Sequence, residues 1–171
     1  MINGRDGMAK WGKISCGGMR TLAEKMEKLG PEMEQVFRDV SQKQAGALME
    51  KARKRTPVGA PPRGLSEDAR KYWSGYTGGN LRKSWTAEPV QKTGRGYAVT
   101  VINNAAYASD VEYGHRQEAG RFVPALGRRL KVSFVPGEYM LHLSVKEVER
   151  SAPKALEQAV NEKLMEVFGG D

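Results

Sequence analysis

The chain has 171 residues, 39% of them apolar and 28% charged, with 20 glycines and a formal net charge of +8. This composition predicts a polar globular protein with one core and long irregular segments. It argues against a disulfide-bonded protein, a zinc protein, a membrane-spanning protein and a secreted protein. The single Cys16 cannot form an internal disulfide and, with only two histidines, cannot build a zinc site of the usual spacing. No apolar run reaches the roughly 18 residues of a membrane helix, and the N-terminal residues lack the apolar region of a signal peptide, so we expect a protein made and used in a reducing cytoplasm.

The positive charge is concentrated in the middle of the sequence. Residues 51–137 carry 16 basic and 6 acidic side chains, whereas residues 1–50 carry 8 and 7, and residues 138–171 carry 4 and 7. A local basic field of this kind attracts nucleic acid or an acidic protein face. An ordinary solvated surface is the alternative, and the charge pattern alone leaves both open.

The pattern of residues 1–55 predicts an arm followed by two helices. Residues 1–18 are rich in glycine and lack a sustained period, which predicts a flexible arm before a single α+β domain over 19–171. From Met19 an apolar spacing of four and three residues predicts a first helix, and Gly30-Pro31 ends it. Proline favours the first turn of the next helix, which we expect to end at Arg55, where a basic cluster suits the helix dipole.

Residues 56–79 predict a long loop, because prolines and glycines interrupt any regular pattern. Such a length usually has a function. Three aromatic side chains lie in it beside Arg70 and Lys71: Tyr72, Trp73 and Tyr76. Aromatic and cationic side chains together can stack on single-stranded bases or anchor a protein interface. Since no nucleic-acid motif accompanies them, we favour the protein interface.

Two β-hairpins are predicted next. The first joins residues 85–90 to 97–102 through a glycine-containing loop, after one helical turn that Asn80 caps, and should pack on the long helix. A short helix over 105–113 leads to the second hairpin, which joins 122–126 to 130–135 around Gly127. Helices over 138–148 and 151–168 complete an α+β fold, in which a small antiparallel sheet of two hairpins packs against a long N-terminal helix and C-terminal helices.

No catalytic motif is present. The only pairing of acid and base worth considering is Glu112 with His115, three residues apart. The chain contains neither a nucleophile elbow, nor a zinc-protease motif, nor a phosphate-binding glycine loop. We therefore predict no enzymatic activity.

Four segments occur in an order that resembles the tail-component family of long-tailed bacteriophages, whose members are called tail-completion, neck or head–tail joining proteins. They are Thr56-Pro57-Val58, the run from Thr77 to Trp85, Tyr107-Ala108 with Val111 to His115, and Phe122-Val123-Pro124 or Phe134 to Gly137 before Met140. The resemblance covers roughly residues 31–168. Two features depart from the family pattern: the second glycine in Gly78-Gly79 and an elaborated hairpin over 125–133.

The resemblance implies a structural virion protein, assembled in the bacterial cytoplasm, that forms a hexameric ring between the head connector and the tail tube or terminator. DNA would pass through such a ring without specific binding, so we expect the basic charges to face acidic neighbouring proteins. The resemblance also implies that no cofactor is bound. It marks Glu112, Tyr113, Gly114 and His115 as its most recognisable segment. A basic nucleic-acid-binding protein that uses residues 51–137 is the alternative function.

The residues from Tyr107 to His115 and those from Gly127 to Arg129 are predicted to have different roles. We expect the first segment to be a structural corner, because Gly114 allows a sharp exit from the short helix. We expect the second to contact a partner protein. The predicted partner contacts are the three loop aromatics and three arginines: Tyr72, Trp73, Tyr76, Arg82, Arg128 and Arg129.

Overall fold

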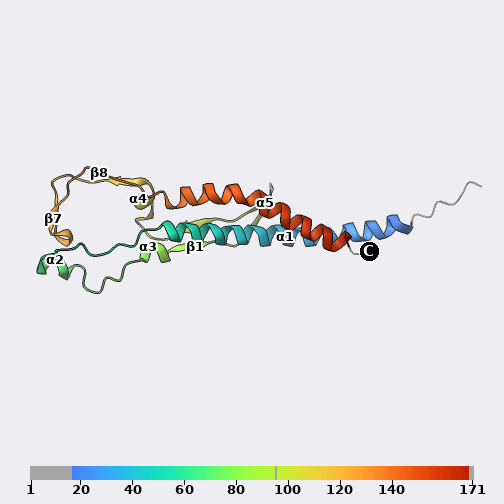
Figure 1. The fold of residues 1–171 in the computed structure, drawn as a ribbon, viewed down its shortest axis with the longest axis horizontal. Helices are drawn as coiled ribbons and strands as arrows, with labels where there is room; N and C mark the ends of the chain where they lie inside the picture. Colours follow the sequence, from blue (N-terminus) through green and yellow to red (C-terminus); the bar gives the residue numbers. More distant parts are fainter. Residues whose placement is uncertain (1–16, 95, 170–171) are drawn as a thin grey trace, which may run out of the picture.

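The computed structural model describes residues 17–94 and 96–169. Two long helices, α1 (Gly17–Arg55) and α5 (Met140–Phe168), pack along the axis of an elongated molecule, and α5 crosses α1 toward its C-terminal end (Figure 1). The predicted arm over residues 1–18 falls mostly on residues 1–16, outside the described residues. The α+β class is confirmed, because antiparallel strand pairs accompany the helices.

Each long helix replaces two predicted helices. Helix α1 continues through Pro31 and α5 continues through Pro153, so the predicted breaks at these positions are wrong. A proline inside a helix costs about 3 kcal/mol. Here the half-buried stripe keeps its phase across the proline, since Leu29, Met33 and Val36 follow one another at steps of four and three. Packing between α1 and α5 therefore offsets the local cost.

The first predicted hairpin is confirmed. Strand β1 (Trp85–Ala87) pairs antiparallel with β4 (Val101–Asn103), and β2 (Gln91–Thr93) pairs with β3 (Gly96–Ala98). The hairpin packs on α1, as the sequence predicts. The turn before it, α3 (Asn80–Lys83), begins after Gly79, so Asn80 is the first helical residue rather than the cap.

The second hairpin differs from its prediction. Strand β5 (Gly114–Arg116) pairs with β8 (Phe134–Pro136), and β6 (Phe122–Val123) pairs with β7 (Arg128–Arg129) around the 3-10 turn η1 (Pro124–Leu126). Residues 114–136 thus form one long two-stranded ribbon, called the ribbon below. It projects beyond the helix pair (Figure 1). Pro124 starts the turn and Gly127, with φ of 62°, ends it, so Arg128 and Arg129 lie on a strand instead of at the tip.

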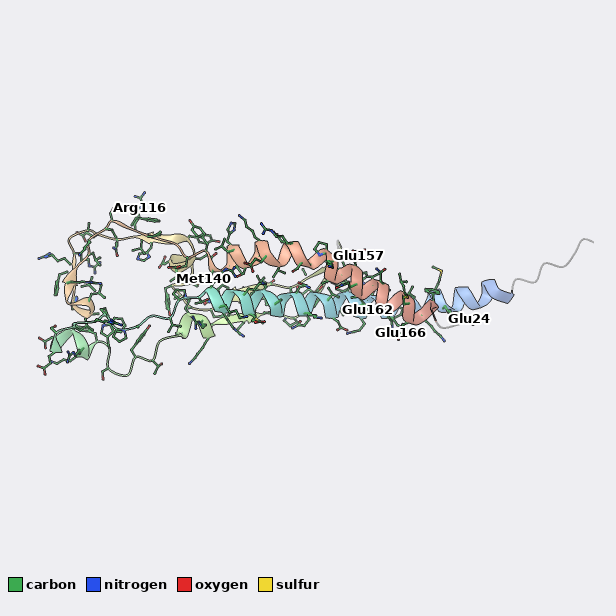
Figure 2. The ribbon with its side chains drawn as sticks, in the orientation of Figure 1. Glu24, Arg116, Met140, Glu157, Glu162 and Glu166 are labelled. Atoms are coloured by element: carbon green, nitrogen blue, oxygen red, sulfur yellow. The ribbon has the colours of Figure 1, made fainter. Side chains whose placement is uncertain are left out.

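The core lies where the base of the ribbon meets the two helices and the first hairpin. Its buried cluster consists of Ala52, Leu81, Trp85 and Met140, and Met140 marks this junction in Figure 2. The short helix α4 (Ala108–Tyr113) packs beside it through Ala108 and Val111. Tyr107, the residue before α4, is 44% exposed, so its side chain does not join this core.

Candidate functional site

Glu112 joins the base of the ribbon to the start of α5. Its side chain is 6% exposed, and its two carboxylate oxygens accept the backbone N–H groups of Leu141 and His142, each at 2.9 Å. The first N–H groups of a helix have no partner inside the helix, and the positive end of the helix dipole favours an anion there. Glu112 therefore acts as a tertiary cap for α5.

Gly114 makes the close approach between α4 and the ribbon possible. Its φ is 84°, and a Cβ atom at this position would lie 2.4 Å from the Val135 carbonyl oxygen. Gly137 is equally crowded, since its Cβ would lie 2.3 Å from the Glu112 carbonyl oxygen. The segment from Glu112 to Gly114 and the facing Gly137 thus form a tightly packed corner, and only glycine fits at positions 114 and 137.

Tyr113 and His115, the other two residues of the predicted family segment, have different surroundings. Tyr113 is 65% exposed, so its ring lies on the surface of the corner. His115 of β5 is half-buried and lies opposite Val135 of β8, and its Nδ1 has no hydrogen-bond partner among the described residues. Because both oxygens of Glu112 are bound to α5, this carboxylate does not orient His115 for proton transfer.

Arg82 holds the start of the long loop. Its Nε and Nη2 atoms donate to the Thr56 carbonyl oxygen at 3.1 and 2.6 Å. Thr56 is completely buried, and its hydroxyl accepts the indole N–H of Trp85 at 2.8 Å. The structure therefore gives this arginine, predicted to contact a partner, an internal role at the end of α1.

The basic end of α1 is also used internally. Lys51 and Arg55 both pair with Glu147 of α5, the first at 2.8 Å, and Arg53 donates to the Trp85 carbonyl oxygen at 2.9 Å. The hydrogen bond from Lys51 and the charge of Arg55 lower the pKa of Glu147. Part of the positive charge of residues 51–137 thus joins α1 to α5 and to the first hairpin.

The far end of the ribbon is attached to the long loop. The indole N–H of Trp73 donates to the Ala125 carbonyl oxygen at 2.7 Å, and the Tyr76 ring meets Trp73 edge-on at 5.0 Å. This loop contains a short helix that the sequence analysis missed, α2 (Glu67–Lys71). Its signal is Ser66 followed by Glu67 and Asp68, because the Ser66 hydroxyl caps the helix. Tyr72 remains 63% exposed.

The ribbon carries a basic and aromatic surface. Its five cations are exposed and take part in no ion pair that the described residues form: Arg116, Arg121, Arg128, Arg129 and Lys131. Phe122 and Phe134 are 52% and 50% exposed, and Phe134 lies opposite Arg116 on the same face. The predicted contacts Arg128 and Arg129 belong to this surface. Exposed arginine and aromatic side chains are the residues that contribute most to protein interfaces.

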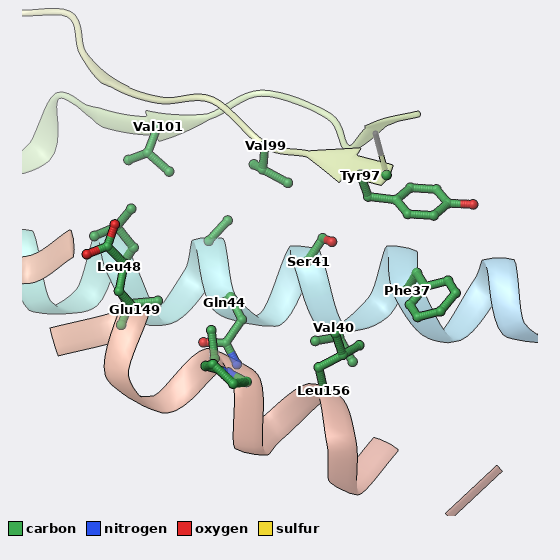
Figure 3. A pocket seen from close by; sticks show the side chains of 15 residues that line it. Phe37, Val40, Ser41, Gln44, Leu48, Tyr97, Val99, Val101, Glu149 and Leu156 are labelled. Carbon is green, nitrogen blue, oxygen red and sulfur yellow. The ribbon is translucent and has the colours of Figure 1, made fainter. Parts of the chain in front are cut away.

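An apolar groove opens between α1, α5 and the first hairpin. Its volume is about 810 Å³, and Figure 3 shows α1 as its floor, with the hairpin and α5 on either side. Its apolar lining includes Phe37, Val40, Leu48, Val99, Val148 and Leu156. The sequence analysis expects the hairpin to cover α1 but did not find the groove. The alternation of Tyr97, Val99 and Val101 was the available signal, because it presents one apolar face.

The described part of the chain contains neither a cluster of metal ligands nor a membrane-spanning helix. No group of three or more His, Cys, Asp or Glu side chains in residues 17–94 and 96–169 could hold a metal ion. Within the same residues, no helix is long and apolar enough to span a membrane.

Comparison with known proteins identifies one family. The HK97-gp10-like family, described as the bacteriophage HK97-gp10 tail-component, matches residues 20–114. The match includes α1, the long loop, the first hairpin and the corner up to Gly114, whereas the rest of the ribbon and α5 follow it. The comparisons with curated proteins and with solved structures gave no match.

Proposed function

Because the chain belongs to the HK97-gp10-like family of bacteriophage tail components, we propose that it completes the tail by joining the head connector to the tail. As a tail component it is a structural protein of the virion that contacts other virion proteins. In this proposal it acts at the neck as a hexameric ring, between the connector and the tail tube or terminator. The ring is assembled in the host cytoplasm, lets DNA pass without specific binding and has no enzymatic role.

The exposed surface of the chain supports assembly most strongly. Among the described residues, fourteen large apolar side chains are exposed, whereas the buried apolar core has seven residues. The open apolar groove adds to this exposed apolar surface. Exposed apolar surface on this scale is typical of a subunit that buries it against neighbouring chains.

The contacts of the predicted interface residues support two different roles within this function. We propose that Tyr72, Arg128 and Arg129 contact neighbouring proteins directly. All three side chains are exposed, and those of Tyr72 and Arg128 form no hydrogen bond or ion pair with the described residues, whereas Arg129 also donates to the Gly120 carbonyl oxygen within the ribbon at 2.7 Å. Trp73, Tyr76 and Arg82 hold the loop and the ribbon in position, through the hydrogen bonds and ring contact described above. The corner from Glu112 to His115 sets the angle at which the ribbon leaves the helices.

Phage particles made without this chain test the neck role. Electron microscopy of a lysate in which the gene carries an early stop codon should show filled heads and separate finished tails. Supplying the full chain should restore joined particles. Complete phages in its absence, or heads without any finished tails, would contradict a role in joining.

The alternative of a nucleic-acid-binding protein rests on the cations of the ribbon together with Arg63, Arg70 and Lys83, all of which are exposed and form no ion pair with the described residues. Lys51, Arg53, Arg55 and Arg82 are bound internally, which leaves fewer free cations than the charge of residues 51–137 suggests. If this alternative holds, DNA affinity should fall steeply with added salt. Absence of retention on DNA at low salt would remove it.

A further inference from the structure

Charge is separated between the two ends of the molecule. The ribbon carries 5 basic side chains and a single acidic one, Glu118. At the opposite end, residues 24–34 of α1 and 154–168 of α5 together carry 7 acidic and 4 basic side chains. Figure 2 shows this arrangement, with Arg116 on the ribbon and Glu24, Glu157, Glu162 and Glu166 along the far part of the helix pair.

The acidic end is not neutralised within the chain. Lys163 pairs with Glu32 and Glu166, each at 3.0 Å, and Lys92 pairs with Glu34, but Glu24, Glu157 and Glu162 form no ion pair with any described residue. An exposed apolar side chain lies among them. Met165 is 73% exposed and follows Glu162 by three residues, so the two side chains are neighbours on the surface of α5.

The two ends are therefore complementary in both charge and apolar content. On the ribbon, exposed Phe134 lies opposite Arg116 and exposed Phe122 lies opposite Arg129; on α5, exposed Met165 has Glu162 and Glu166 as exposed neighbours. Contact between such surfaces buries the apolar side chains and places opposite charges around them, which is the usual arrangement of a protein interface.

We propose that the ribbon of one copy docks on the acidic face of α5, around Glu157, Glu162 and Met165, in the next copy. This interface rests on the proposed ring assembly and specifies its subunit contact. Every copy carries both surfaces, at opposite ends of an elongated molecule (Figure 2). A contact between two different surfaces is head-to-tail and adds further copies in the same direction. It produces a closed ring when the rotation between neighbouring copies closes, and an open filament when it does not.

Reversal of charge on either surface tests the contact. Arg121→Glu with Arg128→Glu changes the ribbon, and Glu157→Lys with Glu162→Lys changes α5; none of these four side chains has an internal ion pair in the described structure. Sedimentation velocity of the full chain at low ionic strength should show that each pair raises the dissociation constant of self-association at least about tenfold. The variant with all four changes should assemble again, because the exchanged charges attract.

A matched control changes the same amount of charge elsewhere. Lys43→Glu with Lys83→Glu alters two exposed lysines of α1 and α3, outside both surfaces, and should leave assembly unchanged. Equal assembly of the wild type and both reversed variants would overturn this interface and leave the proposed ring intact. A wild-type chain that stays monomeric, alone and with head and tail proteins, would overturn the ring and this interface together. Failure of the fourfold variant to assemble would also contradict direct charge pairing.

Discussion

At the scale of single residues, the corner between α4, the ribbon and α5 depends on atoms that leave no space for substitution. Gly114 has φ of 84° and ψ of 168°, a region of backbone conformation that is almost restricted to glycine. Next to it, Glu112 replaces the missing hydrogen-bond acceptors at the start of α5. Folding therefore explains two residues of the segment that resembles other tail components, Glu112 and Gly114.

Gly114→Ala should lower the free energy of unfolding by more than about 2 kcal/mol, because backbone strain is added to a clash with Val135 and Gly137. Gly120→Ala is the matched control in the same ribbon. Gly120 also has a positive φ, 86°, but nothing lies within 4 Å of its Cβ position, so this change should cost only about 1 kcal/mol. Urea denaturation of both variants measures the difference, and equal losses would show that the corner is not crowded.

The ion pairs of Glu147 should make stability depend on pH. The hydrogen bond from Lys51, together with the charge of Arg55, lowers the pKa of this carboxyl in the folded chain. A lowered folded-state pKa adds stability above the unfolded-state pKa, and this stability is lost as pH falls through the folded-state pKa. Glu147→Gln should thus destabilise the protein at neutral pH and weaken its acid-induced loss of stability. Thermal unfolding across pH measures this, and an unchanged acid profile would contradict it.

At the scale of elements, the ribbon and the long loop form one unit that is joined at its far end. Trp73 provides the joint, through its N–H bond to Ala125. Trp73→Phe keeps an aromatic ring but removes this donor, at a cost of about 1 kcal/mol. Hydrogen exchange should become faster near the tip of the ribbon, for example at the amide of Gly120, which donates to the Leu130 carbonyl oxygen, and at the amide of Leu130, which donates to the Arg121 carbonyl oxygen.

The same exchange measurement on Tyr72→Phe provides the control, because Tyr72 is adjacent in sequence but exposed. This variant should exchange like the wild type. Uniformly faster exchange throughout the chain for Trp73→Phe would show that the indole supports the global fold instead of the joint.

Prediction of the elements succeeded where local pattern and tertiary packing agree. Alternating residues with glycines between them determined the first hairpin, and the apolar spacing located both long helices. The predicted helix ends at Pro31 and Pro153 were wrong because the local sequence shows only the cost of a proline inside a helix. Packing between α1 and α5 outweighs this cost. The pairing of β5 with β8 links residues about twenty apart through an irregular segment, and no local pattern specifies such a pairing.

The site was less predictable than the fold. The sequence predicts the same role, contact with a partner, for Arg82 and Arg128. The structure shows both side chains exposed, but Arg82 donates to the Thr56 carbonyl oxygen. The role of Glu112 at the start of α5 depends on residues 29 and 30 positions away in sequence. Such long-range partners cannot be read from spacing along the chain.

At the scale of the whole molecule, the chain resembles one part of a larger assembly. Its small buried cluster, open groove and separated charges are all expected for a subunit whose remaining surface is covered by neighbouring copies. Charge-driven contacts of this kind weaken with salt, because ions screen exposed pairs beyond about 8 Å at physiological ionic strength.

Native mass spectrometry of the full chain at low ionic strength tests ring assembly most directly, with the head connector and tail proteins added in a second series. The account predicts one closed stoichiometry, a hexamer, with no larger open species. A monomer under every condition, both alone and with the partner proteins, would contradict it.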